Sequence, residues 1–145
     1  MTTTTVTRSI AASPETVFDA IAHIQNFSKI CTDIVDVEFL SEQTKGVGTR
    51  FRETRMMGKG KAATELEVTE YEPHSRVRMV SDAGGTIWDT VFTVKPQGSD
   101  AVELKLVMEA RAYKLLAKLF NPLIKGMVQK AIEKDMDAVK AHCEQ

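Results

Sequence analysis

Hydrophobic and polar residues alternate through the middle of the chain, from residue 35 to residue 110. A period of two is typical of β-strands that bury one face and expose the other. Short turn sequences separate the alternating runs, and "DAGG" at 82–85 is typical of a tight hairpin. Consecutive strands joined by tight turns form an antiparallel meander, so the pattern predicts six such strands in one sheet.

The apolar side of each strand predicts the inner face of this sheet. In the last strand, the apolar residues Val102, Leu104 and Leu106 alternate with charged ones. Met108 continues this apolar side of the last strand. The same alternation in the other strands predicts a further set of inward residues: Ala62, Thr64, Leu66, Val68, Val77, Met79, Ser81, Trp88, Thr90, Phe92 and Val94. A register error of one residue would exchange each strand's inner set for its outer set.

Helical patterns stand on both sides of the meander. After a short strand at Val6–Ile10, "SPETVFDAIAHI" predicts a helix, because Ser13 can cap free backbone amides and Pro14 suits the first helical position. The sequence "QNFSKI" then predicts a second short helix or a turn. The last segment, from about Tyr113 to His142, predicts a long helix that Pro122 kinks or divides.

The first half of the long helix is strongly apolar on one side. The residues on that side are Leu116, Leu119, Phe120, Leu123, Ile124, Met127 and Ala131. The opposite side carries the basic residues Arg111, Lys114, Lys118 and Lys125. Beyond Lys130 the apolar stripe drifts to Val128, Ile132, Met136, Val139 and Cys143. The stripe is wider than the one that an ordinary surface helix needs.

Three surfaces could cover this apolar side: a lipid membrane, a second helix in a coiled coil, or the protein's own sheet. A membrane-bound helix would leave the inner face of the sheet uncovered, and exposing the large apolar side chains there forgoes about 20 kcal/mol. Pro122, Gly126 and the drifting stripe disfavour a coiled coil. We therefore expect the helix to pack across its own sheet.

Composition and charge exclude several classes of protein. The chain has 145 residues, enough for a sizeable core, and we expect residues 1–145 to form one domain. The formal net charge of −1 lacks the basic excess of a dedicated nucleic-acid binder, so we expect no nucleic-acid partner. No segment is long and apolar enough for a signal peptide or a transmembrane helix, which predicts a soluble, cytoplasmic protein.

Residues that bind metals or cofactors show no matching spacing. Cys31 and Cys143 lie far apart and predict two free thiols in a reducing compartment. The sequence "GKGK" at 58–61 lacks the spacing of a phosphate-binding loop. No metal-ligand spacing links the three histidines, which are His23, His74 and His142. We therefore expect neither a metal nor a cofactor.

The order of these elements and several short motifs resemble a known group of proteins. The motifs are "SPETVFDAIAHIQNF", "GVGTRFRE", "EYEPHSRVRMV", "WDTVFTV" and a terminal helix ending in "AVKAHCE". Together, over about Val6 to Glu144, they resemble the START-like superfamily, and most closely its polyketide cyclase/dehydrase and lipid-transport family (SRPBCC). The resemblance implies an α+β helix-grip fold, with a curved antiparallel sheet of about seven strands, two short helices and a long C-terminal helix packed across the sheet. Helix and sheet would then enclose a cavity for an apolar small molecule.

The inward strand residues and the helices would line such a cavity. We expect Phe27 and Ile30 at its mouth, with Phe120 and Met127 closing it from the long helix. The predicted sheet walls are Met79, Trp88, Phe92 and Met108, and the predicted polar contacts are Thr64, Ser81 and Thr90. Methionine suits a cavity wall because its flexible side chain adapts to different ligands. Trp88 would serve equally well as an ordinary core residue.

A charged pair on one strand predicts a polar spot in the same cavity. Phe51, Glu53 and Arg55 alternate, so they share one strand face. If that face is inward, Glu53 and Arg55 must pair with each other or bind a polar group of a ligand, because an unpaired buried charge is costly. Glu53 is also the candidate general acid or base, and an ordinary salt bridge at the cavity rim is the simpler interpretation.

These patterns favour a protein that binds one hydrophobic small molecule, such as a lipid, an isoprenoid or a polyketide-like aromatic compound. A cyclase or dehydratase could use the same cavity, so the pattern does not decide whether the protein is an enzyme. As a third alternative, the basic side of the long helix could bind an acidic partner or touch a membrane surface transiently. The sequence is compatible with a monomer or a homodimer.

Overall fold

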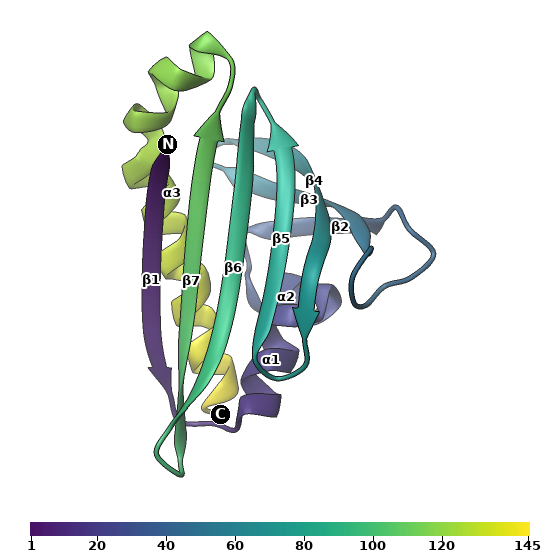
Figure 1. The fold of residues 1–145 in the computed structure, drawn as a ribbon, viewed down its shortest axis with the longest axis vertical. Coiled ribbons are helices and arrows are strands. Elements are labelled where there is room, and N and C mark those ends of the chain that lie inside the picture. The colour runs from purple at the N-terminus through teal and green to yellow at the C-terminus, as the bar shows by residue number, and fades with distance from the viewer.

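The computed structural model describes residues 1–145 and has two layers, a sheet of seven strands and three helices on its inner side (Figure 1). The strands are β1 (Thr2–Ile10), β2 (Ile34–Phe39), β3 (Arg50–Met57), β4 (Gly60–Glu72), β5 (Arg76–Ala83), β6 (Thr86–Gln97) and β7 (Ala101–Ala112). The helices are α1 (Pro14–Ala22), α2 (Ile24–Ile30) and α3 (Leu115–Cys143). The predicted α+β helix-grip fold is confirmed.

All neighbouring strands are antiparallel, in the order β1-β7-β6-β5-β4-β3-β2. The predicted six-stranded meander is therefore confirmed, and β1 lies beside its last strand, β7 (Figure 1). β1 is longer than predicted, because the threonines before Val6 continue the pairing with β7 as far as Thr2, opposite Ala110. The first and last strands in the chain thus lie next to each other at one edge of the sheet.

The inner face of the sheet is the one that the alternation predicted. Phe51, Val77 and Leu104, on three different strands, are each at most 1% exposed. A bulge between Val68 and Glu70 bends β4, which helps to curve the sheet around this face. The curved inner face forms most of the hydrophobic core together with α1 and the second half of α3.

The two short helices also form where the sequence predicted them. The Ser13 hydroxyl caps α1 by accepting a hydrogen bond from the backbone N–H of Thr16 at 3.2 Å, and Pro14 occupies the first turn. Phe18 and Ile21 of α1 are each 1% exposed and belong to the main core. The apolar side of α1 therefore packs against the inner layer of the protein, beside the C-terminal end of α3 (Figure 1).

The prediction that α3 packs across the sheet is confirmed for the second half of the helix and wrong for the first half. The second half packs on the core through Ile132, Met136 and Val139, each at most 6% exposed. The first half was expected to pack on the sheet through residues that are instead largely exposed: Leu116 (68%), Leu119 (61%), Phe120 (55%), Leu123 (76%) and Met127 (51%). The smaller residues Ala117 and Asn121 are buried there in their place. None of the three helices combines the length and the apolar character that crossing a membrane requires.

The angle between the two apolar stripes of α3 explains this difference. At about 100° per residue, the stripe through Leu116 and Leu123 lies roughly half a turn away from the stripe through Ile132 and Val139. A single helix can turn only one of them toward the sheet, and α3 continues through Pro122 instead of restarting there. The second stripe enters the core, so it sets the rotation of the whole helix.

The start of α3 lies against the turn between β5 and β6. Gly84 and Gly85 form this turn with positive φ angles of +61° and +81°, as expected for the tight hairpin at "DAGG". The backbone N–H of Tyr113 donates to the carbonyl of Gly85 at 2.9 Å. A Cβ atom added at Gly85 would lie 2.7 Å from the Cβ atom of Lys114, whereas one added at Gly84 would meet no atom within 4 Å.

Gly85→Ala is therefore expected to lower the free energy of unfolding by more than Gly84→Ala. Left-handed backbone costs about 1–2 kcal/mol for a residue with a Cβ atom, and this applies to both positions. Only at Gly85 does the new methyl group also collide with the start of α3, and such overpacking adds about 1–3 kcal/mol. Urea unfolding of the two variants measures the difference, and equal losses would contradict the packing of α3 on this turn.

Candidate functional site

A cavity of about 440 Å³ lies between the inner face of the sheet, α2 and α3. Twenty-one of the 30 residues that line it are hydrophobic, so a molecule inside would meet mainly hydrocarbon. Met57 at the end of β3 and Met127 on α3 line the cavity and are also 42% and 51% exposed. These two side chains therefore border its opening to solvent.

Most of the residues predicted to line a cavity are brought together here. They are Phe27, Phe51, Glu53, Arg55, Thr64, Met79, Ser81, Trp88, Thr90, Phe92, Met108 and Met127. Strand alternation brings most of them together, because every second residue of β3 to β7 points to the inner face. Phe27 enters from α2 and meets the ring of Phe92 edge to face, with ring centroids 5.9 Å apart. Their contact with a ligand stays a prediction.

Two predicted lining residues lie elsewhere. Ile30, expected at the mouth, is partly buried against the hydrophobic core and does not line the cavity. Phe120, expected to close the cavity from α3, is 55% exposed and also lies outside the lining. The rotation of α3 that its second half imposes turns Val128 toward the cavity, together with Ile124 of the predicted apolar side.

A charged cluster lies in the cavity wall where β3 meets α3. Arg55 Nε donates to Glu53 Oε1 at 2.7 Å, and Arg55 Nη1 and Nη2 donate to the two carboxylate oxygens of Asp135 at 3.3 and 2.7 Å. Only 21% of the Arg55 side chain, 16% of Glu53 and 9% of Asp135 are exposed. The pairing of Glu53 with Arg55 that the sequence suggested is present, and α3 supplies a second carboxylate.

Burial and charge set the protonation states around this cluster. Burial alone would lower the pKa of Arg55, but its hydrogen bond to Asp135 and the attraction of both carboxylates outweigh burial and raise that pKa. Burial, followed by the charge of Asp135, raises the pKa of the Cys31 thiol. Cys31 is therefore a protonated thiol and a poor nucleophile, and both it and Cys143 are free and buried.

No group of three or more His, Cys, Asp or Glu side chains is placed to hold a metal ion.

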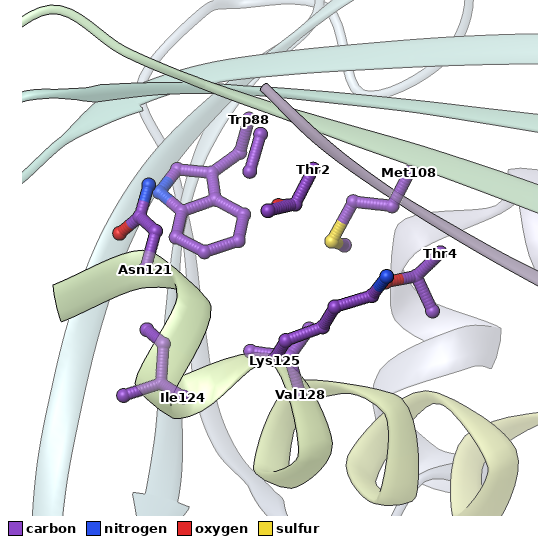
Figure 2. Close-up of a pocket in the computed structure, with 9 residues that line it drawn as sticks. Thr2, Thr4, Trp88, Met108, Asn121, Ile124, Lys125 and Val128 are labelled. Carbon is purple, nitrogen blue, oxygen red and sulfur yellow. The ribbon is translucent and has the colours of Figure 1, made fainter. Parts of the chain in front are cut away.

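Trp88 stands between this cavity and a smaller one of about 10 Å³, which is room for about one water molecule. Figure 2 shows its indole ring beside Asn121 of α3, with Thr2 and Met108 on the other side. Four side chains line both spaces: Trp88, Met108, Ile124 and Val128. Trp88 is thus a wall of the larger cavity as well as part of the packing beneath α3.

Comparison with known proteins identifies the family of this chain. The family model described as "Polyketide cyclase / dehydrase and lipid transport" matches residues 1–144. The chain belongs to that family. The match confirms the resemblance that the motifs predicted, whereas comparison with curated proteins finds no match.

Solved structures share the fold of this member of the polyketide cyclase/dehydrase and lipid-transport family over almost its whole length. The Zhui aromatase/cyclase from Streptomyces sp. R1128 is 14% identical, with a TM-score of 0.82 over 99% of this chain and 93% of that one. A START superfamily protein from Mycobacterium smegmatis is 14% identical, with a TM-score of 0.81 over 99% and 97%. A Thalictrum norcoclaurine synthase variant is 17% identical, with a TM-score of 0.71 over 98% and 94%. At these identities the likeness shows the fold alone.

Sequence reasoning missed several cavity residues of this family member, and Asp135 is the most important. It lies within the buried stripe of α3, between Ile132 and Met136, and is itself 7% exposed. A carboxylate in such a stripe is rarely buried without a partner, so its position was a usable signal. Ile34 and Val37 of β2 also line the cavity. Neither was among the predicted lining residues, although "VDVEFL" at 35–40 alternates and contains Val37.

Proposed function

We propose that this protein binds one hydrophobic small molecule in the cavity between sheet and α3. The apolar cavity of about 440 Å³ is the observation that supports this most strongly. Sites for small organic ligands usually measure about 300–1,000 Å³ and combine apolar walls with a few polar groups. Here the polar groups include the hydroxyls of Thr64, Ser81 and Thr90 and the charged cluster.

The apolar walls of the cavity also favour a ligand. Because Met57 and Met127 border an opening to solvent, water reaches these walls when no ligand is bound. A hydrophobic molecule that displaces this water gains about 25 cal/mol for each Å² of apolar surface that it buries, or about 2.5 kcal/mol per 100 Å². Its atoms also make dispersion contacts with the lining side chains.

The lining side chains favour a lipid, an isoprenoid or a polyketide-like aromatic compound as the ligand. Trp88, Phe27 and Phe92 offer flat surfaces for rings or unsaturated chains. Met79, Met108 and Met127 add flexible side chains that adjust to the shape of the occupant.

A cyclase or dehydratase activity is a second candidate, favoured by the charged cluster in the cavity wall. A cavity that folds a reactive chain beside Glu53, Arg55 and Asp135 could both orient the chain and move protons. The description of the family, and the aromatase/cyclase among its structural relatives, support the same candidate.

Native mass spectrometry after incubation with a panel of lipids, prenyl quinones and aromatic polyketides tests the proposed function. We expect a one-to-one adduct with at least one of these classes. A protein that stays at its apo mass with the whole panel would contradict the proposal. If the recovered compound has lost one water relative to the compound supplied, the dehydratase candidate takes precedence over simple binding.

A further inference from the structure

The charges that line the cavity are unbalanced. Among the lining residues, only Asp33, Glu53, Arg55 and Asp135 are ionisable. Asp33 accepts hydrogen bonds from Lys134 Nζ at 3.0 and 3.1 Å, so a lysine outside the lining offsets its charge. The remaining groups are two carboxylates and one guanidinium. The cluster thus carries one net negative charge beside an apolar space.

The single guanidinium is already engaged by both carboxylates. Arg55 has five N–H donors, and three of them donate to Glu53 and Asp135. The contact with Asp135 uses both ends of the guanidinium fork, which is the arrangement that would otherwise hold a carboxylate from a ligand. A second anion in the cavity would therefore meet an occupied fork and two like charges.

The cluster does keep the capacity to accept hydrogen bonds. Glu53 accepts from Arg55 through Oε1, and its second oxygen, Oε2, has no hydrogen-bond partner in the protein. The carboxylate lines the cavity and lies opposite Thr64 of β4 on the same sheet face. A ligand that places an N–H or O–H group near Glu53 would satisfy this oxygen, because ionised carboxylates are strong acceptors.

The rest of the cavity separates these polar groups from an apolar region. Phe92, Leu106 and Met108, on β6 and β7, line the cavity several strands away from Glu53 on β3. No histidine or lysine lines it, so no other cation is present to attract an anionic group. The cavity is thus amphipathic, with its charged groups at the β3 side.

We propose that the cavity selects amphiphiles with a protonated amine at the polar end and discriminates against free carboxylic acids. This inference rests on the proposed function, because it concerns the same cavity. An ammonium group brings both the hydrogen-bond donors that Glu53 can accept and the charge that balances the cluster. A neutral alcohol brings the donor without the charge, so its affinity is expected to lie between those of the amine and the acid.

Three probes of equal chain length test this selectivity: decylamine, decanol and decanoic acid at pH 7, each below its aggregation limit. Each competes with N-phenyl-1-naphthylamine, a neutral fluorescent probe that reports occupation of an apolar cavity. We expect decylamine to displace the probe at a concentration at least tenfold lower than decanoic acid. Equal potency of amine and acid, or greater potency of the acid, would overturn the inference.

Glu53→Gln provides the matched variant, since it removes the charge and keeps the size of the side chain. We expect it to reduce the preference for the amine over the acid at least threefold, with folding checked by circular dichroism. Glu65→Gln is the control, because Glu65 pairs with Arg52 and lies outside the cavity lining. An unchanged preference in folded Glu53→Gln, or an equal change in Glu65→Gln, would contradict the role of the cluster.

Binding of the neutral probe distinguishes a failure of the proposed function from a failure of the proposed selectivity alone. If N-phenyl-1-naphthylamine itself does not bind, the cavity is closed to ligands, and the proposed function fails together with the selectivity. If the probe binds and all three amphiphiles displace it equally well, the proposed function stands and only the selectivity fails.

Discussion

Ser81→Trp is expected to weaken ligand binding by a factor of about 100 while the protein stays folded. Ser81 lies in the middle of β5, is 5% exposed and lines the cavity. An indole at this position would occupy space that the ligand needs, and a 100-fold loss of affinity corresponds to about 2.8 kcal/mol. Fluorescence titration with N-phenyl-1-naphthylamine measures the affinity of each protein.

Val80→Trp is the matched control for this substitution. Val80 precedes Ser81 on the same strand, so its side chain points to the opposite face of the sheet. The control places the same indole on the outside, and its affinity for the probe is expected to stay within about twofold of the wild-type value. If folded Ser81→Trp binds the probe as tightly as Val80→Trp does, the probe does not occupy this cavity.

Arg55→Met is expected to lower the free energy of unfolding by about 3–5 kcal/mol at pH 7. The substitution leaves the carboxylates of Glu53 and Asp135 without their shared cation, with side chains only 16% and 9% exposed. Removing one partner of a buried ion pair is usually this costly, because the remaining charge is neither solvated nor paired. Urea unfolding of the variant and the wild type measures the loss.

The loss in Arg55→Met should also depend on pH. In the variant, the folded state disfavours the ionised form of both carboxyl groups, so it binds protons more strongly than the unfolded state does. Stability therefore falls as pH rises, and the difference from the wild type is expected to be smaller at pH 5 than at pH 7. A difference that is equal at both pH values would contradict the burial of unpaired carboxylates.

Arg52→Met is the control on the same strand. Arg52 pairs with Glu38 and Glu65 at 3.1 and 2.9 Å on the outer face, and its side chain is 40% exposed. Exposed ion pairs contribute little, so the expected loss is below about 1 kcal/mol. Adding Glu53→Gln and Asp135→Asn to Arg55→Met should recover part of the stability, because no unpaired charge then stays in the cavity wall.

The sheet could be predicted almost completely from the sequence, because its signals are local. Alternation along each strand identified the inner face, and the glycines of the β5–β6 turn identified the tight connection. The N-terminal threonines were harder to assign. Their place in β1 depends on pairing with β7, about a hundred residues away in the chain. Such pairing leaves no local pattern in a run of identical polar residues.

The candidate site was predictable where it rests on strands and less so where it rests on helices. Phe51, Ser81 and Thr90 line the cavity because the two-residue period leaves only two choices of face. Phe120 was misplaced because the sequence of the first half of α3 carries a stronger apolar stripe than the half that packs. Ile30 was also misplaced, because a helix as short as α2 has too few residues for its sequence to show which side is packed.

The sequence by itself determined the order of the elements, the inner face of the strands from β4 to β7 and the family. Only the tertiary structure decided which side of α3 faces the sheet and which acidic residue joins Arg55. Both follow from the same physical cause. A helix has one rotation for its whole length, and the second half of α3 sets that rotation when Ile132, Met136 and Val139 enter the core. The same rotation places Asp135 against Arg55 and leaves Leu116 and Leu123 exposed to solvent.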